Sequence, residues 1–278
     1  MTARIEKVTS LAECDTARAI AATVWGADSA CSTPQMSVHA KYGGVVLLAY
    51  VDEQPVGFLF SFPALYRGEW VLWSHETAVL PEYLHQGIGT RLKFAQREAA
   101  KELGYKTIGW TYDPLVSRNA HFNLNKLGAR IVEYKVNAYG ADEDDLVNRG
   151  IETDRFIAVW DVQEESDRGQ PIGTHGNAHE VVLAVLEDGQ PALHRFGHDD
   201  SAPGDFGHPG SSGHRGHPGI ELITQIPLAS PNTHNLRVAW REAFRAAALG
   251  LVEQGFVPVA FRRGNYGEYV WHKSLSQR

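Results

Sequence analysis

A strand that turns into a helix at a pair of glycines constrains this fold most. Residues from Trp70 to Leu80 read as a strand, and Gly87-Ile88-Gly89 follows shortly after. Apolar residues then recur on one helical face, at Ile88, Leu92, Ala95, Ala99 and Leu103, and Gly104 ends the pattern. This succession predicts an α/β domain, in which strands and helices alternate along the chain.

The remaining patterns extend this domain in both directions. Before the strand that begins at Trp70, we expect a strand at 5–9, a helix at 11–25, a loop at 31–43 and a hairpin of two apolar runs at 45–51 and 56–62. After it we expect a strand at 106–112, a helix from Ser117 to Gly128, and strands near 129–138 and 155–162. The whole predicts a mixed sheet flanked by helices, in a first domain of residues 1–162.

The second half of the chain reads as a smaller α+β unit at 178–278, joined by a polar linker at 163–177. Its strand-like runs lie at 181–186, 220–226, 256–261 and 268–272, and a helix is lined by Leu236, Trp240, Ala243, Ala247 and Leu251. Residues 194–219 are dominated by Gly, His, Pro, Ser and Asp. Such a composition buries too little apolar surface to offset the loss of chain entropy, which predicts a flexible insertion.

Composition and charge exclude several classes of protein. The 278 residues carry a formal net charge of -7, so the chain lacks the basic excess of a general nucleic-acid binder. The two cysteines, Cys14 and Cys31, form no disulfide framework and show no metal-ligand spacing, which fits a reducing cytoplasm. The opening residues are polar, and no apolar run approaches the length of a membrane span. We expect a cytoplasmic protein that acts on small molecules, without a membrane partner.

The glycine turn at 86–90 points to phosphate binding. The first N–H groups of a helix have no partner within the helix, and the helix dipole favours an anion beside them. Glycine at 87 and 89 would let a phosphate approach the backbone closely. The alternative is a turn in which glycine serves only tight packing.

With its flanking strands and helices, this turn resembles the acyl-CoA-binding core of the GNAT superfamily of N-acetyltransferases over about residues 5–162. The resemblance implies a GNAT-like sheet. It also implies a loop that holds the pyrophosphate of coenzyme A through Gln86, Gly87, Ile88, Gly89 and Thr90. Leu84 departs from the family pattern, which has Gln or Arg at this position. Backbone amides carry most of the phosphate contact, so this departure removes little of the expectation.

Further motifs resemble a bacterial subfamily of about this length, whose members are described as acetyltransferases and, in some cases, as amino-acid N-succinyltransferases. These motifs are Ser74-His75, Thr111-Tyr112-Asp113-Pro114-Leu115, Ser117-Arg118-Asn119-Ala120, Lys126-Leu127-Gly128, Thr153-Asp154-Arg155-Phe156 and Trp240-Arg241. The resemblance implies an acyl-CoA co-substrate, either acetyl-CoA or succinyl-CoA. The insertion at 194–219 is not part of the subfamily pattern.

Acyl transfer to an amine needs a base for the amine, a donor for the developing oxyanion and a proton for the leaving thiolate. The resemblance places the oxyanion donor at the backbone N–H of Val79 or its neighbour. His75 is the first candidate base and Glu76 the second, because consecutive strand residues face opposite ways and only one can face the site. The alternative for His75 is a hydrogen-bonded packing residue. The tyrosine acid of the family is replaced by Leu124, and Tyr112 fits packing better, so no acid is assigned.

Arg118 and Asn119 begin the following predicted helix. Asn119 is a candidate for binding the pantetheine, and Arg118 for binding an acidic acyl group or the carboxylate of the acceptor. Helix capping and a solvated arginine are the alternatives. The arginine row Arg237, Arg241 and Arg245 fits a solvated helix face better than a ligand site. The histidines of the linker and insertion lack a fixed second shell, so no metal site is expected.

We therefore expect an acyl-CoA-dependent N-acyltransferase that acts on a small amine or amino acid by direct transfer. The alternative is a non-catalytic acyl-CoA-binding or sensing protein, which Leu84 and the missing tyrosine favour. A homodimer stays open, because the sequence does not determine the oligomeric state.

Overall fold

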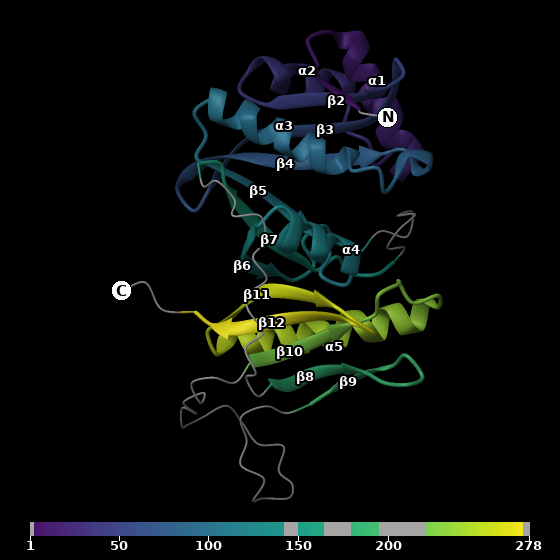
Figure 1. The fold of residues 1–278 in the computed structure, drawn as a ribbon, viewed down its shortest axis with the longest axis vertical. Helices are drawn as coiled ribbons and strands as arrows, with labels where there is room; N and C mark the ends of the chain where they lie inside the picture. Colours follow the sequence, from purple (N-terminus) through teal and green to yellow (C-terminus); the bar gives the residue numbers. More distant parts are fainter. Residues whose placement is uncertain (1–2, 142–149, 164–178, 195–220, 275–278) are drawn as a thin grey trace, which may run out of the picture. The chain divides into compact units, whose positions relative to one another are not determined.

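The computed structural model describes residues 3–141, 150–163, 179–194 and 221–274. They belong to two compact units (Figure 1). The first unit holds Met1–Asp113 and Phe122–Gly169, and the second holds Pro114–His121 and Gln170–Arg278. The short segment Pro114–His121 therefore groups with the second unit, although in sequence it lies between two parts of the first.

The first unit is built on a sheet of seven strands in the order β1-β2-β3-β4-β5-β7-β6. The strands are β1 (Arg4–Lys7), β2 (Val45–Val51), β3 (Gln54–Tyr66), β4 (Glu69–Val79), β5 (Thr107–Tyr112), β6 (Arg130–Lys135) and β7 (Arg155–Asp161). Neighbouring strands are antiparallel except β4 and β5, which run parallel. The predicted mixed sheet is confirmed.

Helices cover both faces of this sheet. α1 (Leu11–Trp25) and α2 (Thr33–Lys41) pack on one face, where Phe58 joins their core cluster. α3 (Ile88–Glu102) packs on the other, because a side chain at the neighbouring Gly57 would contact Leu92 of α3. Gly57 and Phe58 are successive residues of β3 and therefore point to opposite faces of the sheet. α1 and α2 thus lie on one face, and α3 lies on the other.

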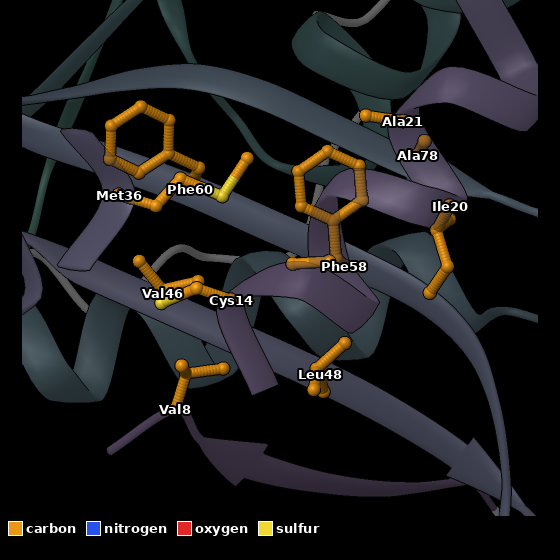
Figure 2. Packing of buried hydrophobic residues seen from close by; sticks show 11 residues of the cluster. Val8, Cys14, Ile20, Ala21, Met36, Val46, Leu48, Phe58, Phe60 and Ala78 are labelled. Carbon is orange, nitrogen blue, oxygen red and sulfur yellow. The ribbon is translucent and has the colours of Figure 1, made fainter. Parts of the chain in front are cut away.

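The core under α1 and α2 illustrates how the period-2 pattern of the strands sets their faces (Figure 2). The sheet contributes Val46, Leu48, Phe58, Phe60 and Ala78, and the helices contribute Cys14, Ile20, Ala21 and Met36. Each of these residues is at most 5% exposed. A shift of one residue in any of these strands would turn its apolar set away from the helices, so packing fixes the register.

One expectation about helices was wrong, and a second was met only in part. The segment 31–43 is not a loop but contains α2, whose start is capped by Ser32, with proline in its first turn. The helix expected from Ser117 to Gly128 is divided into α4 (Ser117–Ala120) and a π-helical turn, η2 (His121–Lys126). The wider π turn changes which side chains share a face after residue 120. A short 3-10 turn, η1 (Pro81–Tyr83), follows β4.

The second unit carries a sheet of five strands in the order β11-β12-β10-β8-β9. The strands are β8 (His179–Val185), β9 (Pro191–Leu193), β10 (Glu221–Ile226), β11 (Phe256–Arg263) and β12 (Gly267–Lys273). The helix α5 (His234–Glu253) packs on this sheet and buries Trp240, Phe244 and Leu251. The predicted smaller sheet with one long helix is confirmed. Apart from His194, the expected insertion at 194–219 lies outside the described residues.

Within the described residues, no helix is both long enough and apolar enough to cross a membrane.

Candidate active site

The parallel strands β4 and β5 separate soon after they meet (Figure 1). They pair at two positions only, Leu72 with Ile108 and Trp73 with Gly109. Beyond these positions, β4 continues to pair with β3 and β5 with β7. The inner edges of β4 and β5 past Trp73 and Gly109 therefore have no strand partner in the described part of the chain. An extended ligand can hydrogen bond to such an edge as an added strand does.

The paired positions close one end of this opening, and there the ring of Trp73 lies close to Gly109. A Cβ atom added at Gly109 would lie 3.1 Å from the Trp73 ring, which explains why glycine stands at this position. An extended ligand that enters between β4 and β5 would therefore stop near Ser74 and Trp110, the first residues past the paired positions.

A β-bulge on β4 changes the direction in which the side chains of the two candidate bases, His75 and Glu76, point. Phe60 of β3 pairs with Glu76, whereas the next residue, Ser61, pairs with Ser74, so His75 is the extra residue on β4. An extra residue interrupts the alternation of side chains between the two faces. The rings of Phe60 and Phe62 lie 5.8 Å and 5.4 Å from the His75 ring, on the face covered by α1 and α2.

His75 and Glu76 consequently lie side by side, which corrects the expectation that they face opposite ways. Nε2 of His75 is 3.8 Å from Oε1 of Glu76. The two side chains differ in exposure, because that of His75 is 39% exposed and that of Glu76 only 9%. The pair thus connects a buried carboxylate to an imidazole at the surface.

The environment of Glu76 makes its carboxyl group a weaker acid than that of an ordinary glutamate. Oε1 accepts a hydrogen bond of 3.2 Å from the backbone N–H of Cys31, and Oε2 has no hydrogen-bond partner. Burial raises the pKa of Glu76 to about 7, and the hydrogen bond from Cys31 opposes this shift in part. Burial lowers the pKa of His75 below its ordinary value, with a smaller contribution from His39. Each group is able to accept a proton near neutral pH.

The glycine turn forms the start of α3. Gly87 is the N-cap residue in the left-handed conformation, with φ of 78°, and no side chain caps the helix. The first helical hydrogen bond runs from the N–H of Arg91 to the carbonyl of Gly87. The N–H groups of Ile88, Gly89 and Thr90 precede this bond, so the helix itself leaves them without an acceptor.

Packing does not explain the two glycines of this turn. A Cβ atom added at Gly87 or at Gly89 would meet nothing within 4 Å. The positive φ accounts for glycine at position 87, but Gly89 is an ordinary helical position where glycine costs about 1 kcal/mol relative to alanine. Open space at both Cβ positions, beside backbone amides that the helix leaves without an acceptor, fits the approach of a phosphate, and it argues against the packing alternative.

The face that α3 turns to the sheet is more polar than predicted. Ile88, Leu92 and Ala99 are buried as expected, but Leu103 is 49% exposed. Lys93, Gln96 and Arg97 are instead buried, each at most 5% exposed. The sequence contained a signal for these buried polar residues. They flank the apolar positions of α3 at helical spacing, where a helix that only packs against a core would carry apolar side chains.

Lys93 is the most unusual of these residues. Its Nζ donates a hydrogen bond of 3.0 Å to Oγ of Ser74 and lies 3.9 Å from the centre of the Trp110 ring. Burial lowers the pKa of Lys93 to about 7. Sequence reasoning missed this residue.

The other residues expected to form the site are placed as follows. Val79 is the last residue of β4 and pairs with Gly57. Gln86 is exposed, and its amide nitrogen donates to the carbonyl of Glu82. Arg118 and Asn119 lie in the segment that groups with the second unit, where Arg118 is exposed. The described residues contain no group of three or more potential metal ligands.

Comparison with known proteins relates part of the chain to one family. Residues 18–128 match the model of the Acetyltransferase (GNAT) family. The matched stretch begins in α1 and contains β4, the glycine turn and β5. The first unit therefore contains a GNAT acetyltransferase domain, and the resemblance found in the sequence is confirmed. No curated protein matches the chain significantly.

Solved structures of acetyltransferases resemble part of the chain. The ribosomal-protein-S18-alanine N-acetyltransferase of Escherichia coli is 14% identical, with a TM-score of 0.47 over 60% of this chain and 97% of its own. Naa50 of Arabidopsis thaliana, in complex with the bisubstrate analogue CoA-Ac-MVNAL, is 15% identical, with a TM-score of 0.45 over 57% and 98%. A GNAT family acetyltransferase of Elizabethkingia anophelis with bound acetyl-CoA is 18% identical, with a TM-score of 0.40 over 57% and 97%.

Proposed function

We propose that this protein transfers an acetyl or succinyl-type group from coenzyme A to a small amine or amino acid, by direct attack of the amine on the thioester. The observation that carries the proposal is the position of Glu76, a buried carboxylate with a free oxygen, next to the opening between β4 and β5. A buried ionisable group with a pKa near neutrality and no compensating cation is typical of a catalytic base.

The start of α3 would bind the pyrophosphate of the acyl-CoA. The N–H groups of Ile88, Gly89 and Thr90 point out of the helix, and Gly87 and Gly89 leave room for a phosphate above them. Gln86 is exposed beside this turn and supplies a side-chain donor. The pantetheine would then run along the inner edge of β4, past Val79, toward Ser74.

The acyl carbonyl would lie beside β4 near Ser74, where an N–H group on the unpaired edge polarises it, so the oxyanion donor moves from the expected Val79 toward the bulge. An amine that enters from the α1 and α2 side meets Glu76 first. Glu76 would accept the ammonium proton, which leaves a neutral amine to attack the carbonyl carbon. His75, at 3.8 Å from Glu76 and partly exposed, would pass the proton to water. Glu76 therefore becomes the main base in this proposal, and His75 the connection to solvent.

Turnover of acyl-CoA with a panel of amines and amino acids tests the proposal. Acetyl-CoA and succinyl-CoA would be offered separately, with release of the free thiol as the signal. We expect turnover with at least one amine, and a loss of ~10²–10⁴-fold in rate for Glu76→Gln with little change in acyl-CoA affinity. Tight acyl-CoA binding without turnover of any amine would instead favour the non-catalytic acyl-CoA-binding or sensing protein.

The surroundings of the amine site favour a compact acceptor. His39, Phe60 and Phe62 contact one another beside His75, with ring centroids 5.2 Å to 5.9 Å apart. The backbone N–H of Cys31, shortly before α2 in the chain, hydrogen bonds to Glu76. Arg118 as a ligand for an acceptor carboxylate and Asn119 as a ligand for pantetheine remain proposals, and so does a homodimer.

A further inference from the structure

Lys93 has an environment that packing alone does not explain. It is 3% exposed, and its only hydrogen-bond acceptor among the described residues is the hydroxyl of Ser74. No carboxylate of the described residues lies within ion-pair distance of its Nζ. A methionine would fill the same volume without the free-energy cost of burying an uncompensated ammonium group.

The ammonium group of Lys93 lies where β4 and β5 separate. Ser74 and Trp110 are the first residues of β4 and β5 past the last paired positions, and both contact Nζ of Lys93. The indole N–H of Trp110 donates to Oδ1 of Asn123 at 3.1 Å, which fixes the ring. Lys93 thus places a cation at the closed end of the opening between the two strands.

The reaction creates an anion at this end of the opening. In the proposed function, the pantetheine runs from the start of α3 along β4, which brings its sulfur toward Ser74. From Val79 to Ser74, β4 covers about 17 Å at about 3.3 Å per residue. Glu76 lies on the α1 and α2 face of the sheet, whereas Ser74 and Lys93 lie on the α3 side. The amine and the departing sulfur would therefore have proton-transfer groups on opposite sides of the carbonyl carbon.

We propose that Lys93 is the general acid that protonates the thiolate of coenzyme A as it leaves. This inference rests on the proposed function. The amine nitrogen forms a bond to the carbonyl carbon, the carbon–sulfur bond breaks, and its electron pair stays on sulfur. A proton moves from Nζ of Lys93 to the sulfur. Glu76, which has already passed the ammonium proton to water through His75, takes the second proton that the nitrogen loses as it becomes an amide. After the products leave, water returns a proton to Lys93 and removes one from Glu76.

Two alternatives for the acid are less well placed. Leu124 stands where the family has a tyrosine, and its side chain has no proton to give. Tyr112 lies on β5 three positions beyond Gly109, farther from the closed end of the opening than Trp110, which contacts Lys93. Ser74 accepts the hydrogen bond of Lys93 and so orients its ammonium group, which makes Ser74 a positioning residue.

The test measures the ionisation of the thiol of bound coenzyme A, which a purely structural lysine would not affect. The ultraviolet absorbance of the thiolate would be followed against pH for coenzyme A bound to the full-length protein. Desulfo-coenzyme A, which lacks the sulfur, provides the spectral blank and a measure of affinity. A nearby lysine lowers the pKa of a thiol below its ordinary value, which free coenzyme A provides in the same measurement. The protein's own Cys31 does not interfere, because burial raises its pKa to about 11.

We expect the bound thiol in the wild-type protein to have a pKa at least ~1 unit below its ordinary value, and Lys93→Met to remove this shift. The affinity for desulfo-coenzyme A should stay within about twofold, and kcat should fall ~10–100-fold. Lys101→Met, at a partly exposed position in the last turn of the same helix, is the matched control and should change neither. Melting curves verify folding, and Lys93→Gln serves as a second neutral variant if methionine prevents folding.

The outcomes separate this inference from the proposed function. An ordinary thiol pKa in the wild-type complex, or a lowered one that persists in a folded Lys93→Met protein, would overturn the role of Lys93 while leaving the acyltransferase proposal intact. Absence of coenzyme A binding to the wild-type protein would overturn both.

Discussion

Replacing Glu76 by glutamine should stabilise the protein at alkaline pH while it removes activity. Burial raises the pKa of Glu76 from 4.5 to about 7, so ionisation of the buried carboxyl costs free energy. A group whose pKa is raised on folding contributes stability below its unfolded pKa and loses that contribution as the pH rises through its folded pKa. A pKa difference of this size corresponds to about 3 kcal/mol. Glutamine retains an oxygen that can accept the N–H of Cys31 and carries no charge.

Urea unfolding at pH 5 and at pH 8 measures this effect. We expect Glu76→Gln to exceed the wild type in free energy of unfolding by about 1 kcal/mol at pH 5 and by about 3 kcal/mol at pH 8. Glu98→Gln is the control, because Glu98 is 65% exposed, and its effect should stay within about 0.5 kcal/mol at both pH values. An equal stability difference for Glu76→Gln at both pH values would refute the reasoning, since it would mean that the carboxyl keeps an ordinary pKa in the folded protein.

Three further predictions concern the site. The acidic limb of kcat/KM against pH should have a midpoint near 7 if Glu76 is the base, whereas a midpoint below 6.5 that disappears in His75→Ala would assign the base to His75. Gly89→Ala should raise helix stability by up to about 1 kcal/mol yet weaken coenzyme A binding measured by calorimetry, and unchanged affinity would count against the phosphate turn. Gly87→Asp should reduce coenzyme A affinity more strongly, because it adds a negative charge beside the proposed pyrophosphate site, and tight binding by a folded variant would contradict the assignment.

Local signals in the sequence were enough to predict the framework of the site. Two apolar runs identified β2 and β3, a further strand was predicted over most of β4, and the glycines at 87 and 89 marked the start of α3. These features depend on neighbours a few residues apart, which is the range over which backbone conformation and capping are decided. The segment 31–43 escaped prediction because α2 has a weak apolar pattern, and its position over β3 is set by tertiary packing.

Only the tertiary structure decided how the candidate residues are used. Strict alternation predicted that His75 and Glu76 face opposite ways, but the bulge opposite Phe60 and Ser61 brings them together, and a bulge depends on the partner strand. The sequence likewise determines that a lysine stands at position 93, next to apolar residues of a helix. That this lysine is buried at the point where β4 and β5 separate depends on strand pairing between residues far apart in the chain, because the pairing fixes which side chains surround its charge.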